Sequence, residues 1–311
     1  MRAAAILGPR ASLDQVRLFR LRHAEVQVEW QLHPSQDYDA VLVFGGDGTV
    51  HRHLKTLAGV NRPVLVVPCG SGNDFARALG LRSRSAALGA WQQFCAGAEN
   101  VRRIDLGVIT PLPAGASSSS TYFCCVGGAG LDSITNRRAN ALPSWLRSRG
   151  GYVASLLREV GSFRPPRITV SIPDRAITGN FVSRISEAAM LVAFGNAPSY
   201  GGGMQIAPKA DLEDGRLDVC FVRQTGKLRL LRVFPIVFSG SHLTLPEVEY
   251  FQTCALRLEA EQPIEVYADG EYVCSTPIEV RVEARPARNH RLARLLAGPP
   301  ATPLALFLAI G

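Results

Sequence analysis

An acidic residue inside a glycine-rich turn, Asp47, is the first candidate for chemistry in this 311-residue sequence. The first glycine turn reads Gly45-Gly46-Asp47-Gly48-Thr49. Glycine has no Cβ that would hold a phosphate group away from the backbone N–H donors of such a turn. A carboxylate beside a bound phosphate is unfavourable unless it binds a cation or takes part in a proton transfer. A tight turn with an N-capping aspartate explains the same residues about equally well, because short glycine motifs often match by chance.

A second glycine turn lies further along the chain and favours the functional interpretation. It contains Gly70, Ser71, Gly72, Asn73 and Asp74. Each turn follows an apolar run typical of a buried parallel strand, Val41–Phe44 before the first and Val64–Val67 before the second. If the two strands are neighbours, both turns lie at the sheet edge where open α/β folds bind ligands.

Further acids stand outside the glycine turns. Asp105 lies in a predicted strand, 101–109, and by itself reads as a solvated acid at a strand edge. Asp269 and Glu271 flank a glycine in a predicted hairpin turn, the acidic hairpin turn. The carboxylate turn, residues 211–218, offers the oxygen ligands that Mg²⁺ prefers, although a solvated Asp-Gly turn fits it as well.

Caps and apolar spacing predict the helices that position these turns. One apolar face follows the first glycine turn and comprises Val50, Leu54 and Leu57. Gly59 stands at the predicted end of that helix, and Ser12 with Gln15 forms a capping box for an earlier one. Ser85 is predicted to cap a helix that ends at Gly97.

From residue 167 onward short strands dominate and predict an antiparallel β-sandwich. The predicted strands are Arg167–Ile172, Ile177–Ser183, Ala188–Gly195, Leu217–Val222, Leu256–Ala260, Ile264–Ala268 and Ile278–Glu283. Helices are predicted over Lys227–Ser239 and Arg288–Leu296. We therefore expect an α/β domain over 1–110, a sandwich domain over 111–284, and a return of 285–311 to the first domain.

Composition limits the classes of partner and compartment. The net charge of +8 favours anionic partners such as nucleotides or acidic membranes; nucleic-acid binding would rest on charge alone, and we expect none. Seven cysteines without metal-like spacing, two of them adjacent at Cys124-Cys125, argue for a reducing cytoplasm. No apolar run is long enough to span a bilayer, so we expect a soluble or peripheral protein.

The two glycine turns together resemble a known family. Gly-Gly-Asp-Gly-Thr followed by Pro-x-Gly-Ser-Gly-Asn-Asp-Phe-Ala-Arg is similar to the catalytic domain shared by diacylglycerol kinases, sphingosine and ceramide kinases, and bacterial lipid kinases. The resemblance extends through the carboxylate turn and the acidic hairpin turn. It implies a Rossmann-like three-layer nucleotide domain, a C-terminal antiparallel β-sandwich, and ATP- and Mg²⁺-dependent transfer of phosphate to a lipid hydroxyl.

The resemblance also implies roles for particular residues. Asp47, Asp269 and Glu271 are candidates for the catalytic base or the holder of the catalytic Mg²⁺. Nucleotide contacts are implied for Gly45, Gly46, Gly48, Thr49, Gly70, Ser71, Asn73, Asp74 and Asp105. A structural Mg²⁺ is implied on the Asp214 carboxylate with the carbonyl groups of Asp211 and Arg216.

Two departures from the family pattern keep alternatives open. The family usually continues the first turn with Asn-Glu, where this chain has His51-Arg52. The family also commonly has a helix before the strand that leads into the first turn, and only His33–Tyr38 is available for it here, so that helix is missing or reduced. A catalytically weakened nucleotide or lipid binder is therefore one alternative. Another is a kinase of soluble substrates, because NAD kinases and phosphofructokinases share Gly-Gly-Asp-Gly. The identity of the lipid and the oligomeric state are left open.

A basic stretch, 136–151, is the candidate for contact with an anionic membrane surface. Four arginines interleave there with Trp145 and other apolar side chains. The arginines are Arg137, Arg138, Arg147 and Arg149. An ordinary exposed helix that packs Trp145 inward explains the pattern as well.

Overall fold

The computed structural model describes residues 1–29, 38–60, 62–113, 119–141, 158–174, 179–283 and 294–296. A six-stranded sheet dominates the N-terminal part, in the order β2-β1-β3-β4-β17-β5. Its strands are β1 (Arg2–Leu7), β2 (Glu25–Val28), β3 (Ala40–Gly45), β4 (Pro63–Pro68), β5 (Val101–Arg103) and β17 (Arg294–Leu296). All pairings are parallel except that of β17 with β5. Every residue of β3 is buried, as an unbroken apolar run predicts.

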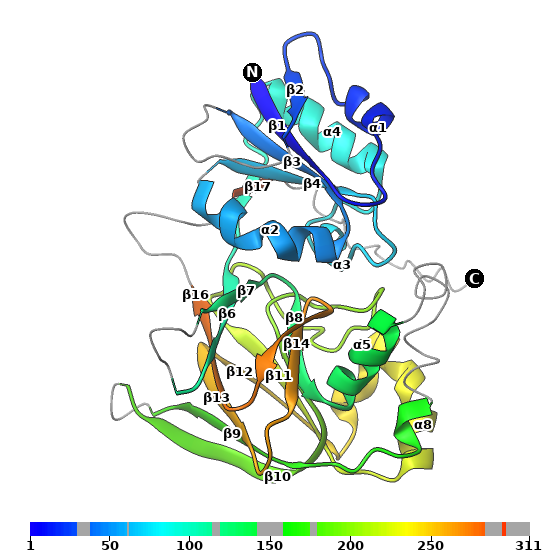
Figure 1. Ribbon diagram of the computed structural model, residues 1–311, viewed down its shortest axis with the longest axis vertical. Helices are drawn as coiled ribbons and strands as arrows, with labels where there is room; N and C mark the ends of the chain where they lie inside the picture. The colour runs from blue at the N-terminus through cyan, green and yellow to red at the C-terminus, as the bar shows by residue number, and fades with distance from the viewer. Residues whose placement is uncertain are drawn as a thin grey trace, which may run out of the picture.

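Helices cover both faces of this sheet. They are α1 (Leu13–Arg17), α2 (Asp47–Val60), α3 (Asp74–Ala78) and α4 (Arg84–Cys95). Figure 1 shows α2 on the side toward the second domain, with α1 and α4 on the other side of the sheet. The Ser12–Gln15 capping box is confirmed, and α2 buries the predicted apolar face.

Two predicted helix ends are wrong. Ser83, not Ser85, caps α4, because its Oγ accepts a hydrogen bond from the Ala86 N–H at 3.1 Å. Gly59 lies inside α2, which continues to Val60.

An antiparallel sheet of eleven strands forms the second domain. Its main path runs β15-β14-β8-β10-β9-β13-β16-β6-β7, and β11 pairs with β10 and β12. The strands are β6 (Leu106–Pro111), β7 (Thr121–Phe123), β8 (Val126–Gly130), β9 (Arg167–Pro173), β10 (Phe181–Gly195), β11 (Leu217–Arg223), β12 (Val248–Thr253), β13 (Ala255–Ala260), β14 (Glu265–Ala268), β15 (Glu271–Ser275) and β16 (Ile278–Glu283). These two sheets confirm the predicted fold class.

The long strand β10 joins the two layers of the sandwich. Its first half pairs with β9, and its second half pairs with β8 and β11, with register shifts in both halves. A separate apolar cluster fills the space between the layers, where Phe123 and Phe194 meet edge to face at 5.6 Å. The predicted strands ending at Ser183 and Gly195 are therefore one strand.

Other predictions for the second domain need correction. The predicted helix over Lys227–Ser239 is α8 (Lys227–Val233) followed by a 3₁₀ helix, η2 (Phe234–Ser239), where Pro235 cannot donate an α-helical hydrogen bond. A further short 3₁₀ helix, η3 (Ser241–Thr244), comes next, and α5 (Leu131–Ala141) follows β8. β12 and β15 were not expected as strands.

The predicted C-terminal helix is wrong at residues 294–296. These residues form β17, which inserts between β4 and β5 of the first sheet. The rest of 285–311 lies outside the described residues, as do residues 33–37 of the segment where a helix was expected to be missing. The domain limits remain a prediction, although the chain passes from the first sheet to the second between β5 and β6.

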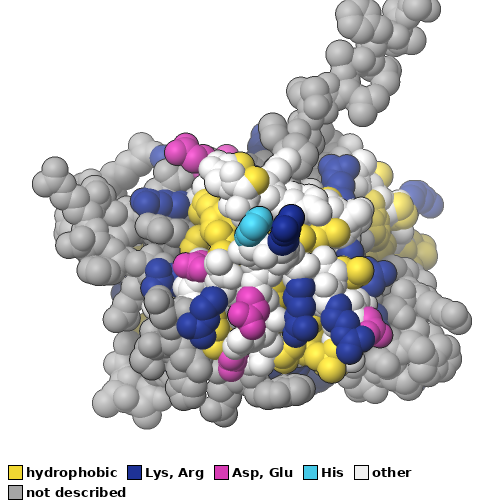
Figure 2. Space-filling model, turned by 90° about the horizontal axis from the view of Figure 1, so that it is seen from above, with side chains coloured by type: hydrophobic (Ala, Val, Ile, Leu, Met, Phe, Trp, Pro, Cys, Tyr) yellow, Lys and Arg dark blue, Asp and Glu magenta, His cyan; other side chains and the backbone are white. Residues whose placement is uncertain are grey.

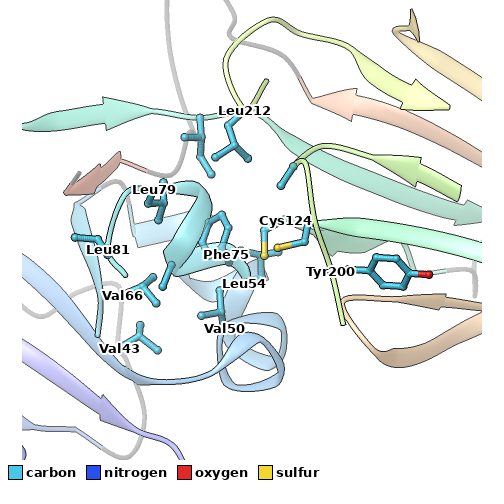
Figure 3. Packing of buried hydrophobic residues seen from close by; sticks show 14 of the residues in the cluster. Val43, Val50, Leu54, Val66, Phe75, Leu79, Leu81, Cys124, Tyr200 and Leu212 are labelled. Carbon is cyan, nitrogen blue, oxygen red and sulfur yellow. The ribbon is translucent and has the colours of Figure 1, made fainter. Parts of the chain in front are cut away.

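An apolar cluster continues from the first domain into the second. It includes residues of β3, β4 and α3, the elements that flank the glycine turns. Figure 3 shows Phe75 of α3 within it, near Leu54 and Cys124, with Leu212 also in the cluster. Because both domains contribute to one cluster, their relative position is fixed by burial of apolar surface. None of the helices in the described part of the chain combines the length and apolar content that a bilayer crossing needs.

Candidate active site

The two glycine turns touch backbone to backbone at the carboxyl ends of β3 and β4. A Cβ added to Gly70 would lie 2.5 Å from the Cα of Gly46, and one added to Gly46 would lie 2.8 Å from the Cα of Gly70. Asn73, at a φ of 55°, accepts a hydrogen bond from the Gly70 N–H and donates one to the Gly70 carbonyl, each at 2.8 Å. The structure thus brings the predicted nucleotide turns together, and contact between the turns is itself a reason for both glycines.

Asp47 opens α2 and also caps α3. Its two carboxylate oxygens accept hydrogen bonds from the backbone N–H groups of Asp74 at 3.1 Å and Phe75 at 3.0 Å. Burial raises the pKa of Asp47 to about 6; hydrogen bonds from the backbone of Phe75 and Asp74 oppose the rise, and the charge of Asp74 adds to it. The group can therefore exchange its proton close to neutral pH.

Asp74 joins the first domain to the second. Its carboxylate accepts hydrogen bonds from the Ser199 hydroxyl at 2.9 Å and the Gly202 N–H at 2.6 Å, and it pairs with Arg77 at 2.6 Å. The residue is only 2% exposed. Above the two acids lies Gly72, where an added Cβ would stand 2.9 Å from Asp47 Oδ2 and 3.2 Å from Asp74 Oδ2. The second glycine turn therefore packs closely on both carboxylates, and Gly72 leaves no room there for a side chain.

Thr49 packs inward instead of facing solvent. A Cβ added to Gly8 would lie 2.4 Å from its Oγ1, and one added to Gly45 would lie 2.5 Å from its Cβ. Beside it lies a pocket of about 550 Å³. The pocket is lined by Leu7, Gly8, Pro9, Ala11, Leu13, Thr49, Arg52 and His53. It has apolar walls and two basic side chains next to the first glycine turn.

The acidic hairpin turn brings the second domain to the first glycine turn. Asp269 accepts hydrogen bonds from the N–H groups of Cys124 at 3.0 Å and Cys125 at 2.8 Å, and its Oδ2 lies 3.1 Å from His51 Nδ1. Its side chain is 0% exposed. Glu271 is only partly buried, and its Oε1 lies 2.9 Å from where a Cβ on Gly48 would stand. The hairpin therefore holds one acid inside and presents the other to the glycine turn.

Asp105 is placed at the carboxylate turn. Its Oδ2 accepts a hydrogen bond from the Gly215 N–H at 2.7 Å, and its own N–H donates to the Leu212 carbonyl at 2.6 Å. The residue is 1% exposed and lies in the loop between β5 and β6. Asp105 thus shapes the turn that was predicted to hold a structural cation.

Two acids of the carboxylate turn, Asp211 and Asp214, are exposed. Asp211 accepts a hydrogen bond from the Glu213 N–H at 3.0 Å, and Asp214 accepts one from the Arg216 N–H at 2.9 Å. The Gln252 amide bridges Asp214 and the buried Asp218, at 3.3 and 3.1 Å. The turn therefore offers oxygen atoms alone, which suits a hard cation.

Several contacts escaped the sequence reasoning. His53 lines the pocket, whereas His51 contacts Asp269 of the second domain. Asp74 accepts hydrogen bonds from Ser199 and Gly202. Both residues belong to the glycine-rich run 199–203, which precedes the carboxylate turn. That run was a visible signal, but nothing local indicated which acid it would bind.

Cys124, Cys125 and Asp269 bring their ligand atoms within 4.8 Å of one another. Burial raises the pKa of Cys124 to about 12, and the hydrogen bond with Cys124 together with burial raises the pKa of Cys125 well above its ordinary value. The Asp269 carboxylate already accepts hydrogen bonds from two backbone N–H groups, so the cluster anchors Asp269.

Comparison with known proteins gives two family matches. Residues 9–109 match the diacylglycerol kinase catalytic domain, and residues 125–288 match the YegS C-terminal NAD kinase beta sandwich-like domain. The chain is 37% identical over 249 residues to the diacylglycerol kinase of Mycobacterium tuberculosis, covering 78% of this chain and 73% of that protein. It is 28% identical over 242 residues to the diacylglycerol kinase of Bacillus subtilis, covering 76% and 72%.

Solved structures agree with the fold. A crystal structure of a diacylglycerol kinase from Bacillus anthracis aligns with a TM-score of 0.62 at 16% identity, over 96% of this chain and 97% of that one. An NAD kinase from Archaeoglobus fulgidus, solved in complex with ATP, aligns with a TM-score of 0.51 at 13% identity, over 96% and 94%. At these identities the likeness concerns the fold alone.

Proposed function

The chain belongs to the diacylglycerol kinase catalytic-domain family, and from that premise we propose that it transfers the γ-phosphate of ATP to the hydroxyl of a diacylglycerol-like or sphingoid lipid, with Mg²⁺. The observation that carries the proposal is the position of Glu271. A carboxylate from the second domain lies against Gly48 of the first glycine turn, while Asp47 stands next to it. Phosphoryl transfer needs N–H donors that bind the phosphate and one group that accepts the proton of the acceptor hydroxyl.

ATP is proposed to bind along the glycine turns and the pocket beside them. The N–H groups of the first turn and the start of α2 face the phosphates, as expected at a helix N-terminus. Arg52 and His53 line the pocket and add positive charge or hydrogen bonding for the nucleotide. The fold shared with an ATP-bound NAD kinase supports this placement. Thr49 contributes by holding Gly8 and Gly45 in position, because its side chain is buried against them.

Two Mg²⁺ positions fit the oxygen donors. At the catalytic position Asp47 and Asp74 would hold the ion, since each Asp47 oxygen accepts a single backbone hydrogen bond and keeps a lone pair. At the structural position the exposed Asp214 carboxylate with the Asp211 and Arg216 carbonyls would hold it. When bound, the catalytic ion neutralises charge on the transferring phosphate.

Glu271 is proposed as the base that takes the proton of the acceptor hydroxyl. Asp269 is less suited, because its carboxylate is fully enclosed and already accepts hydrogen bonds from two backbone amides. Glu271 is partly exposed and lies at the glycine turn, so an incoming hydroxyl can reach it. Asp47 is the acid that stands within the first glycine turn itself.

Membrane contact is proposed for the acceptor lipid, and with it a cytoplasmic, peripheral location. The segment 142–157 lies outside the described residues, so Arg147, Arg149 and Trp145 are not placed. Arg137 pairs with Glu265 at 3.2 Å and Arg138 pairs with Glu159, so these two cations are engaged within the protein. On the face seen in Figure 2, Lys and Arg side chains are spread among acidic and apolar ones. Docking on anionic lipid is proposed for the basic stretch as a whole, that is for Arg137, Arg138, Arg147 and Arg149 with Trp145.

A kinase of soluble substrates is the second candidate, favoured by the fold shared with NAD kinases. Labelled ATP offered with diacylglycerol, sphingoid base, ceramide or polyprenol in mixed micelles, and separately with NAD, distinguishes the two. Label in a lipid product, lost in Glu271→Gln, supports the proposal. Label in NAD alone would replace it with the second candidate. ATP binding without transfer to any acceptor would indicate a nucleotide binder.

A further inference from the structure

His51 makes a buried contact from the first domain to the acidic hairpin turn of the second. Its Nδ1 lies 3.1 Å from Asp269 Oδ2, and the side chains are 10% and 0% exposed. His51 comes from α2, four residues after Asp47, so the same helix carries both the candidate acid and this contact.

Asp269 is otherwise fixed from its own domain. Its N–H donates to the Val126 carbonyl at 3.0 Å, and its carboxylate accepts from the Cys124 and Cys125 amides. Its φ is 51°, and that of Gly270 is 85°, so the chain turns sharply before Glu271. Because only Gly270 lies between Asp269 and Glu271, a shift of Asp269 moves Glu271 relative to Gly48.

We propose that His51 is a positioning residue for phosphoryl transfer: by binding Asp269 across the domain junction it fixes Glu271 against the first glycine turn. The inference rests on the proposed kinase function and identifies how the base is aligned. An asparagine at this position would keep a hydrogen-bond donor. Asparagine Nδ2 and histidine Nδ1 stand at the same distance along the side chain, and Nδ1 is the atom that faces Asp269.

The charges around His51 agree with this role. Burial acts to lower its pKa, but the hydrogen bond and charge of Asp269, with the charge of Glu271, raise the pKa above its ordinary value against the repulsion of Arg52. Cys124 and Cys125, which face Asp269 from the other side, are neutral thiols. The ion pair is therefore complete below pH about 6.5 and is lost as the pH rises through the raised pKa of His51.

Replacement of His51 separates positioning from folding. His51→Leu is expected to lower kcat about 10- to 100-fold, as small misplacement of a catalytic group does, with KM for ATP within about two-fold. His51→Asn is expected to keep most of kcat and to lose the decline on the alkaline side that follows the His51 titration. His23→Gln, at an exposed site away from the junction, is the matched control and should change neither.

Two measurements do not depend on turnover. NMR titration should show that Asp269→Asn lowers the pKa of His51, and hydrogen exchange of the Cys124 and Cys125 amides should be faster in His51→Leu. An unchanged kcat in His51→Leu, or a rise in KM for ATP that accounts for the loss, would overturn the inference. If the wild type transfers phosphate to no acceptor, the kinase proposal fails, and unchanged exchange and titration would then overturn the His51 contact as well.

Discussion

The acids at the domain junction and the acids of the carboxylate turn are held in opposite ways. Asp74 and Asp269 are buried and accept hydrogen bonds from groups far away in the sequence. Asp211 and Asp214 are exposed and accept hydrogen bonds from N–H groups two residues away. The junction therefore needs the whole fold to assemble its acids, whereas Asp211 and Asp214 take their backbone donors from within the turn, to which Asp105 and Gln252 add contacts from elsewhere in the chain.

This difference separates two uses of a carboxylate. At the junction, burial raises the pKa of Asp47 and makes its charge costly, which suits a group that handles a proton or a cation at a phosphate. At the turn, the Asp214 carboxylate is exposed to solvent, which suits a site that binds a cation from solution. Replacing an acid should accordingly have a larger effect on catalysis at the junction than at the turn.

The largest expected effect is that of Asp47→Asn on activity. The amide can neither hold a cation strongly nor accept a proton, so kcat should fall about 100-fold or more. Phosphate transfer from labelled ATP measures it, and circular dichroism checks the fold. Activity within a few-fold of wild type would remove Asp47 from the mechanism and weaken the contrast between the two regions.

The same variant should change how stability depends on pH. A pKa of about 6 in the folded protein, against an ordinary 3.8, means that ionising Asp47 costs about 3 kcal/mol of unfolding free energy at pH 7. That stability is fully present below pH 3.8 and is lost as the pH rises through about 6. Denaturation at several pH values between 4 and 7 should give a shallower decline for Asp47→Asn. Parallel curves for the two proteins would contradict the raised pKa.

Gly70→Ala tests whether backbone contact between the two turns is as tight as the structure shows. The new Cβ would meet the Cα of Gly46, which cannot move aside as a flexible side chain would, so a loss of about 1–3 kcal/mol is expected. Gly89→Ala, in α4 with open space around it, should instead raise stability by about 0.5–1 kcal/mol. Equal melting temperatures for the two variants would speak against close contact of the turns.

The smallest expected effect is that of Asp214→Ala. Its loss should lower activity a few-fold, with partial recovery in excess Mg²⁺, because the remaining oxygens bind the ion more weakly. Asp14→Ala, an exposed acid on α1, serves as the control and should show no Mg²⁺ response. A loss of activity that no Mg²⁺ concentration reverses would identify the turn as purely architectural.

The sequence by itself determined the local parts of this protein. Apolar runs before the glycine turns predicted β3 and β4, and helical spacing predicted the buried face of α2, because these signals depend on neighbouring residues. The fold class followed from the order of such elements. The resemblance to a kinase family rested on motifs that are contiguous in the chain.

Only the tertiary structure decided which distant residues meet. Residues 294–296 read as part of a helix but form β17, because β4 and β5 supply partners on both sides. Asp105 lies at the carboxylate turn, and Asp74 binds Ser199, for the same kind of reason. His51 carried no local sign of its partner 218 residues away. Hydrogen bonds and burial across the domain junction depend on packing, and no window of sequence contains both sides of it.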